Sequence, residues 1–266
     1  MFPLAFLLGL LLSAIIAGFA YWRGSLASSG ALGAMLVGAC IFAGGGFAWG
    51  VVLVAFFVTS SALSHYKERV KEPLAEKFQK GHRRDLGQVF ANGGAGALFA
   101  LGNTFYPHPL WLVAFVGAMA AVNADTWATE LGVLSQSPPR LISTGRIVAV
   151  GTSGGITPLG TFVALCGAMF IGVVVIPFDF PNSLQLLPIA LVSGLFGALF
   201  DSLLGATVQA IYFCDLDQQE TESRVHRRCG RATRLLRGWH WLDNDGVNFS
   251  ASVVGSAAAV LMSALT

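Results

Sequence analysis

Long apolar stretches separated by short polar linkers dominate the hydrophobic pattern of this chain. We place eight of them at residues 4–22, 28–44, 47–65, 88–105, 110–128, 156–177, 186–213 and 246–265. A helix needs roughly 20 apolar residues to cross the hydrocarbon of a bilayer. The pattern therefore predicts an all-α bundle of about eight transmembrane helices, which forms a single integral membrane domain over residues 1–266.

The composition agrees with a membrane protein. Of 266 residues, 55% are hydrophobic and only 11% are charged, too few to cover a soluble domain of this size. The 32 glycines suit close helix packing in lipid. The first apolar stretch follows Met1 without a basic region before it, so we expect a retained helix rather than a cleaved signal peptide.

Basic residues are concentrated in two loops. Of the 16 Lys and Arg, seven lie within residues 67–84 and six within residues 224–237. The positive-inside rule places the surrounding loops, about 66–87 and 214–245, in the cytoplasm. Eight spans then leave both termini outside and put Arg23, Arg140 and Arg146 on the cytoplasmic side. We expect a multi-pass protein of a plasma or thylakoid-type membrane.

A carboxylate lies deep in the apolar stretch 186–213. Asp201, Gly205 and Gln209 recur at every fourth position and would share one face of a helix. A charged group inside a bilayer is costly, so it normally faces a cavity or a partner helix. Asp201 therefore either serves a binding site or joins two helices by a hydrogen bond.

Other polar residues fall in the same half of the predicted bundle. Asp125 lies in the fifth stretch and Asn92 near the start of the fourth. Asp245 and Asn248 share a face at the start of the eighth, where Asp243 or Asn244 is expected to cap the helix.

The segment Gly151-Thr152-Ser153-Gly154-Gly155 opens the sixth stretch, and Arg140 and Arg146 precede it. Such a loop at a helix N-terminus offers free N–H groups and the positive end of the helix dipole to an anion. We expect it to bind phosphate together with the two arginines. The Gly-Lys-Ser/Thr ending of a Walker A motif is missing, so P-loop chemistry is not indicated.

These residues together predict a site for a metal-bound polyphosphate. Asp125, Asp201 and Asp245 are the predicted catalytic residues and ligands of Mg²⁺, which is usually held by one or two carboxylates plus phosphate oxygens. Phosphoryl transfer needs mainly such an ion and donors that stabilise charge on the phosphate. A lipid acceptor would enter from the leaflet. The residues expected to position phosphate or metal-bound water are Asn92, Gln209 and Asn248.

The cysteines add no chemistry in this interpretation. Cys40, Cys166, Cys214 and Cys229 are scattered along the chain, and no Cys-x-x-Cys or Cys/His spacing indicates zinc. No disulfide pairing is indicated either, so we interpret them as isolated thiols.

Six ordered motifs resemble the integral membrane family of phytyl-phosphate kinase and animal transmembrane protein 19 over nearly the whole chain. The motifs are Phe57–Ser61, Arg84–Gly94, Ala124–Gly132, Gly151–Gly155, Asp201–Gln209 and Asp243–Asn248. The resemblance implies phosphorylation of a prenyl monophosphate, such as phytyl or geranylgeranyl phosphate, to the diphosphate. It implies a nucleoside triphosphate donor, with CTP favoured, and in photosynthetic organisms a role in tocopherol synthesis.

Two alternatives are left open. The Asp201 segment is distantly similar to CTP-dependent phosphatidate cytidylyltransferases and dolichol kinase, although the longer Lys/Arg-Asp signature of the cytidylyltransferases is missing. A transporter or flippase would place carboxylates in both leaflets and often carries inverted repeats, which we do not find. The expected partners are the nucleotide, the prenyl-phosphate lipid and membrane lipids, with no nucleic acid and with a homodimer left open.

Overall fold

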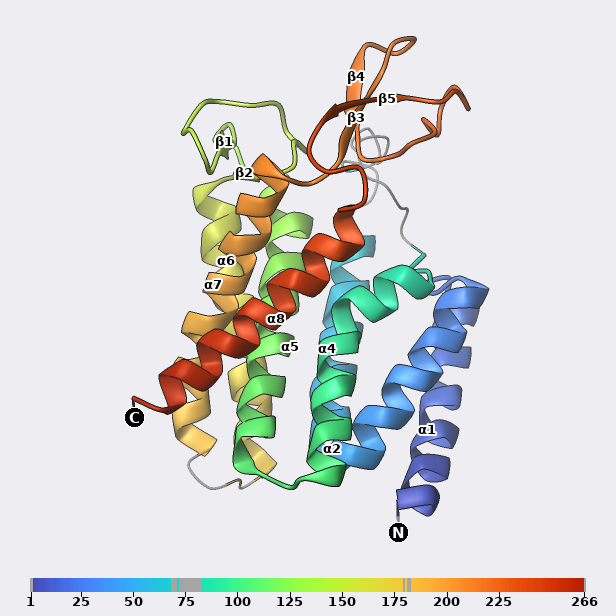
Figure 1. The fold of residues 1–266 in the computed structure, drawn as a ribbon, viewed down its shortest axis with the longest axis vertical. Coiled ribbons are helices and arrows are strands. Elements are labelled where there is room, and N and C mark those ends of the chain that lie inside the picture. Colours follow the sequence, from blue (N-terminus) through green and yellow to red (C-terminus); the bar gives the residue numbers. More distant parts are fainter. Residues whose placement is uncertain (1, 68–70, 72–82, 179, 181–182, 266) are drawn as a thin grey trace.

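The fold is mostly helical, as predicted, and its polar loops gather at one end (Figure 1). This computed structural model describes residues 2–67, 71, 83–178, 180 and 183–265, so most of the first basic loop lies outside the described residues. The helices are α1 (Phe2–Trp22), α2 (Ser28–His65), α4 (Leu86–Phe105), α5 (Pro109–Gly132), α6 (Pro158–Val175), α7 (Leu186–Thr207) and α8 (Asn244–Ser263). Two 3₁₀ turns, η2 (Ile176–Phe178) and η3 (Ser183–Gln185), lie between α6 and α7.

Six of the helices in the described part of the chain are long and apolar enough to cross a membrane. They are α1, α2, α5, α6, α7 and α8, and the spans of α6 and α7 also include the adjoining 3₁₀ turns. The predicted fourth span corresponds to α4, which does not meet this requirement because its sequence includes Gln88, Asn92 and Asn103.

The predicted second and third spans are the two helical arms of α2, which spans 38 residues and is interrupted by the non-helical conformation of Gly46 (φ 76°, ψ −169°). Only glycine adopts this conformation readily. Arg84 contacts the chain at both ends of α2: its carbonyl accepts from the Ala27 N–H at 3.0 Å, and its guanidinium donates to Ser61 Oγ at 2.9 Å. The two arms of α2 therefore run in opposite directions, as the predicted pair of spans would.

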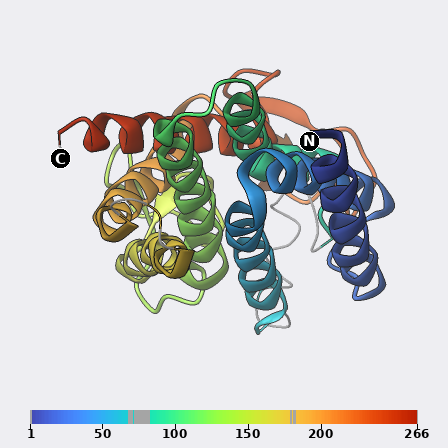
Figure 2. The ribbon, with the colours of Figure 1, turned by 90° about the horizontal axis from the view of Figure 1, so that it is seen from below.

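Helix α5 forms the centre of the bundle and packs against α4, α6, α7 and α8. Phe115 and Met119 on α5 are fully buried. Seen from below, α1 and α2 lie on one side of the bundle and α6 and α7 on the other (Figure 2). The core of the bundle is therefore built around the helix that carries Asp125.

Two small antiparallel sheets, which were not predicted, accompany the helices of the bundle. β1 (Arg140–Leu141) pairs with β2 (Gly155–Ile156), and β3 (Ile211–Cys214) lies between β4 (Gln219–Thr221) and β5 (Arg234–Arg237). Residues 208–213 were predicted as the end of a helix because they are apolar. Helix α7 instead ends at Thr207, and Ile211, Tyr212 and Phe213 belong to the strand β3.

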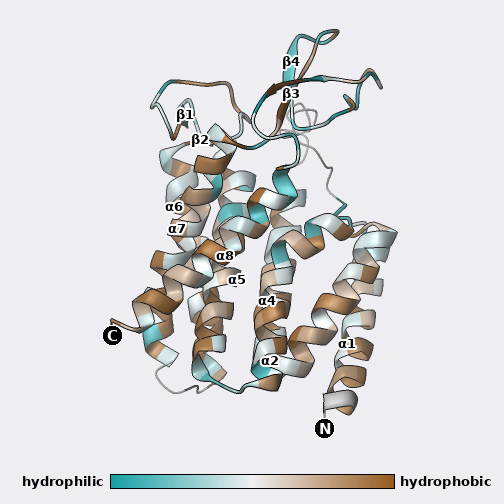
Figure 3. Cartoon of the chain, viewed as in Figure 1, coloured by the Kyte–Doolittle hydropathy of each residue, from teal (hydrophilic) through white to brown (hydrophobic). Residues whose placement is uncertain are grey.

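The sheets and the described parts of both basic loops lie at the same end of the molecule, opposite both termini (Figure 1). Hydrophilic residues are concentrated at this end, whereas the helical body is largely hydrophobic (Figure 3). This arrangement of loops and termini agrees with the predicted topology, while the assignment of the polar end to the cytoplasm stays a prediction.

Candidate functional site

A cavity of about 320 Å³ opens at the polar end of the bundle. Its lining comes from the end of α2, from α4, α5, α6, α7 and α8, from described residues of the first basic loop, from the segment that includes β2, and from the loop after β4. The predicted site residues that line it are Asn92, Asp125, Gly151, Thr152, Ser153, Gly154, Gly155, Asp201, Gln209 and Asn248. The structure thus brings together predicted site residues that are distant in sequence.

Three carboxylates meet in this cavity. They belong to Asp125 of α5, Asp201 of α7 and Glu222, which follows β4. The three lie close enough to interact electrostatically. The Oδ2 atom of Asp201 is buried and has no hydrogen-bond partner among the described residues. An unpaired buried oxygen of this kind is costly unless a ligand or a cation contacts it.

Glu222 is a site residue that the sequence analysis missed. Its side chain is 8% exposed, and its Oε1 atom accepts hydrogen bonds from Ser153 Oγ at 2.6 Å and from Gln209 Nε2 at 3.0 Å. Glu222 therefore connects the Gly151–Gly155 loop to the end of α7. It lies in a segment that we had assigned to a basic loop, and no local pattern distinguished it from solvent-exposed acids.

Gln209 reaches the cavity by a different route from the one predicted. It lies two residues beyond the end of α7, so it does not continue the helical stripe of Asp201 and Gly205. Its own N–H still bonds to the carbonyl of Leu204 at 3.0 Å, which turns the chain toward β3. The side chain is 2% exposed, and its contact with Glu222 fixes it at the cavity.

The Gly151–Gly155 loop also differs from the prediction, because it does not open a helix directly. Gly155 belongs to β2, and α6 begins at Pro158 with Thr157 as its N-cap, whose Oγ1 accepts from the Gly160 N–H at 3.0 Å. Thr157, Gly160 and Thr161 line the cavity, so the N-terminus of α6 still faces it.

Three predicted residues do not line the cavity. The side chain of Arg140 donates to the carbonyl of Gly145 at 2.9 Å within its own hairpin, and Arg146 is exposed on the same hairpin. On α8, Asn244 and Asn248 line the cavity at i and i+4, whereas Asp245 is rotated away from them around the helix. Asp243 caps α8 by accepting from the Gly246 N–H, as expected.

Lys71 and Arg84 are the cations that line the cavity among the described residues. Lys71 forms an ion pair with Glu130 and donates to the carbonyl of Leu63 at 2.7 Å, at the C-terminal end of α2. Glu130 also accepts from Ser64 Oγ at 2.7 Å. The sequence analysis had assigned the positive charge of the site to Arg140 and Arg146 because those arginines are nearer to the glycine-rich loop.

Arg84 lies between the cavity and the helices α1 and α2. Desolvation lowers the pKa of its guanidinium, and the negative charge of Glu130 opposes that effect. The same group contacts the ring of Phe57, 5.6 Å from the ring centroid. Among the described residues, the close side-chain partners of this guanidinium are the Ser61 hydroxyl and the Phe57 ring. A poorly solvated guanidinium in such surroundings is well suited to bind an incoming phosphate.

The donor set fits Mg²⁺. Carboxylate and amide oxygens of Asp125, Asp201, Glu222 and Asn248 surround one cavity, and hard divalent cations prefer such oxygens. The unpaired Oδ2 of Asp201 is the feature that a cation would satisfy.

A second cavity of about 70 Å³ adjoins the first and is almost entirely apolar. It lies among α1, α2 and α4, and three of its lining residues, Arg84, Gln88 and Asn92, also line the polar cavity. An apolar passage therefore meets the polar site at Arg84.

The structure also corrects the view of the cysteines as scattered thiols. The Sγ atoms of Cys214 and Cys229 lie 3.6 Å apart, with Asp217 and His226 beside them. Cys40 and Cys166 lie in α2 and α6.

Fold and site together define a polytopic membrane protein with a carboxylate-lined cavity at one end. Comparison with known sequences identifies its family: residues 11–256 match the family described as integral membrane protein DUF92, and the chain belongs to that family. This confirms the predicted membership of an integral membrane family.

Named relatives cover most of the chain. It is 33% identical to Protein PGR of Arabidopsis thaliana over 92% of each chain. It is 30% identical to an uncharacterized membrane protein of Methanocaldococcus jannaschii, over 89% of this chain and 85% of the relative. It is 24% identical to "Protein VTE6, chloroplastic" of Arabidopsis thaliana, over 89% of this chain and 65% of that protein. No solved structure matches the chain.

Replacing Gly154 by alanine should displace the glycine-rich loop. Gly154 has φ +82°, and an added Cβ would lie 2.4 Å from the backbone nitrogen of Ala206 on α7. We expect Gly154→Ala to lower the free energy of unfolding by about 1–3 kcal/mol more than Gly145→Ala. Gly145 is a matched control because it has φ +69° but no atom near its Cβ position. Chemical unfolding in mixed micelles measures the difference, and equal effects of the two variants would contradict this packing.

Proposed function

We propose that this protein is a membrane-embedded prenyl-phosphate kinase that transfers the γ-phosphate of a nucleoside triphosphate, with CTP favoured, to a prenyl monophosphate. The observation that carries the proposal is the junction of the two cavities at Arg84, Gln88 and Asn92. A substrate with a phosphate head and an apolar tail fits this junction, because the head would contact Arg84 and the tail would enter the apolar cavity.

The triphosphate would occupy the carboxylate side of the polar cavity. Asp125, Asp201 and Glu222 would hold its Mg²⁺ ion, which neutralises phosphate charge and orients the transferred group. The N-terminus of α6 and the Gly151–Gly155 loop face the same space and supply N–H and hydroxyl donors. Asn92 and Asn248 are placed to orient phosphate oxygens by hydrogen bonds.

The reaction needs no general base. An oxygen of the acceptor phosphate dianion forms a bond to the γ-phosphorus, while the bond from that phosphorus to the β–γ bridging oxygen breaks. The nucleoside diphosphate leaves with the bonding electrons, and the prenyl diphosphate remains. The role of the protein is therefore to hold the two phosphates in line and to stabilise the charge that they share.

The family resemblance supports the same reaction class, and the chloroplastic relative supports a thylakoid-type membrane in photosynthetic organisms. The small apolar cavity would accept only the first part of a prenyl chain, and the rest would lie in lipid. A lipid substrate explains why the carboxylates lie within an apolar bundle.

A kinase assay with the purified protein tests the proposal. The reaction contains Mg²⁺, phytyl or geranylgeranyl phosphate, and γ-labelled CTP or γ-labelled ATP. We expect label in a prenyl diphosphate, with CTP the better donor, and a loss of at least about 100-fold for Asp201→Asn. Glu222→Gln should also lower the rate, whereas Glu220→Gln should not, because Glu220 is exposed on β4. A CDP-lipid with released pyrophosphate, or no turnover by folded protein, would contradict the proposal.

Filling the apolar cavity should weaken acceptor binding selectively. Ala34 lines this cavity, and phenylalanine at that position would occupy the space assigned to the prenyl chain. We expect Ala34→Phe to raise the KM for phytyl phosphate by about 10-fold while the KM for CTP stays unchanged. Leu32→Phe is the control, because Leu32 is 62% exposed on the same helix. An unchanged KM for phytyl phosphate would place the chain elsewhere.

A further inference from the structure

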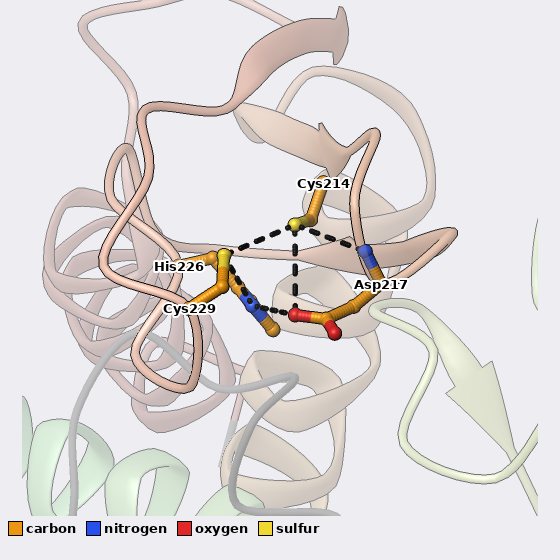
Figure 4. Close-up of side chains that lie close together, drawn as sticks. All are labelled: Cys214, Asp217, His226 and Cys229. Atoms are coloured by element: carbon orange, nitrogen blue, oxygen red, sulfur yellow. Dashed lines mark hydrogen bonds and ion pairs between the residues drawn. The ribbon is translucent and has the colours of Figure 1, made fainter.

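A second constellation of polar side chains lies outside the cavity, in the loop region beyond α7. Cys214, Asp217, His226 and Cys229 point toward one another (Figure 4). One ligand atom from each residue can be chosen such that all four lie within 4.8 Å of one another. The proposed kinase reaction uses none of these residues.

The separations match those of tetrahedral zinc. Zn–S bonds of about 2.3 Å and Zn–N or Zn–O bonds of about 2.1 Å place two sulfurs about 3.8 Å apart, and sulfur about 3.6 Å from nitrogen or oxygen. The two Sγ atoms lie 3.6 Å apart, Cys229 Sγ lies 3.5 Å from His226 Nδ1, and Cys214 Sγ lies 3.8 Å from Asp217 Oδ2. The distance from His226 Nδ1 to Asp217 Oδ2 is shorter, 2.8 Å, and would open slightly around an ion.

Two tight turns deliver the four ligands in pairs with the same spacing. Cys214 and Asp217 flank the turn between β3 and β4, where the Asp217 N–H donates to Cys214 Sγ at 3.5 Å. His226 and Cys229 flank a second turn, which the Gly230 N–H closes on the His226 carbonyl at 2.8 Å. Gly230 has φ +66°, a conformation that favours glycine after the last ligand. Paired ligands with two residues between them in a turn are typical of structural zinc sites.

The site is enclosed, and a neighbouring side chain can orient the histidine. His226 is 0% exposed and Cys214 is 1% exposed. The Nε2 atom of His226 lies 3.0 Å from the side-chain amide of Gln219. A histidine that binds metal through Nδ1 keeps a proton on Nε2, and the Gln219 amide, turned to present its oxygen, would accept it.

We propose that Cys214, Asp217, His226 and Cys229 bind one structural zinc ion. Four protein ligands leave no open position, so the ion would serve the fold rather than catalysis. It would fasten the β3–β4 turn to the turn after His226. Glu222 lies between these two turns, so the ion would also hold that carboxylate against the cavity. The proposal does not depend on the kinase assignment.

The test measures zinc in the full-length protein, purified in detergent with a reducing agent and without a polyhistidine tag. We expect elemental analysis to find about one zinc per chain. Cys214→Ser and Cys229→Ser should each lose most of it, whereas Cys40→Ser should keep it because Cys40 lies in α2. Asp201→Asn should also keep it, which separates this site from the carboxylate cavity.

A second measurement remains informative if the cysteine variants do not fold. Co²⁺ added to the metal-depleted wild-type protein should give the intense visible bands of tetrahedral coordination and a thiolate-to-metal charge-transfer band. Asp217→Asn, a conservative change, should weaken Co²⁺ binding by about 10-fold or more. Three results would overturn the proposal. The first is a protein that contains no zinc and does not bind added zinc. The second is zinc that stays bound after both cysteines are replaced, and the third is a Cys214–Cys229 disulfide in place of the metal.

Discussion

The cost of keeping carboxylates at the end of an apolar helix bundle is the constraint on which the rest of this structure depends. Asp125 and Asp201 arise from two central helices, and Glu222 joins them from a loop. Each carboxylate disfavours the charge of the others, and one buried oxygen of Asp201 has no protein partner in the described part of the chain. Such an arrangement is stable in the charged form only when a cation or a set of donors completes it.

Interruptions of regular helix build the surroundings of these carboxylates. The end of α7 at Thr207 lets Gln209 turn back toward Glu222, and the β1–β2 hairpin holds the glycine-rich loop beside α7. Arg237 on β5 also holds the polar end against α7, because its side chain donates to the carbonyl of Gly205 at 2.8 Å. The polar end is therefore a layer of turns and short strands that the helical bundle supports, and its residues come from nearly every element.

The sequence predicts the part of this site that periodicity can reveal. Apolar stretches located the helices, and polar residues inside them, such as Asp125, Asp201 and Asn92, were found because they stand out in apolar surroundings.

Roles of residues that depend on the path of a loop could not be predicted from the sequence. Lys71 pairs with Glu130 across 59 positions, and Glu222 bonds Ser153 across 69, so neither contact leaves a local pattern. Arg140 and Arg146 are near the glycine-rich loop in sequence, yet their hairpin directs them away from the cavity. Cys214 and Cys229 escaped notice for a related reason, since an Asp and a His complete the two pairs in place of further cysteines.

The central claim is that Asp125, Asp201 and Glu222 form one site for a divalent cation and a nucleotide. The most direct measurement is electron paramagnetic resonance of Mn²⁺, which shares the oxygen ligands of Mg²⁺, added to the purified protein with CTP. Our account predicts one bound Mn²⁺ per chain, with phosphorus coupling from the nucleotide. It also predicts an affinity at least about 10-fold weaker in Asp201→Asn. Two results would contradict this account. One is Mn²⁺ that stays in solution, and the other is Mn²⁺ that binds to the Asp125→Asn and Asp201→Asn variants as tightly as to the wild-type protein.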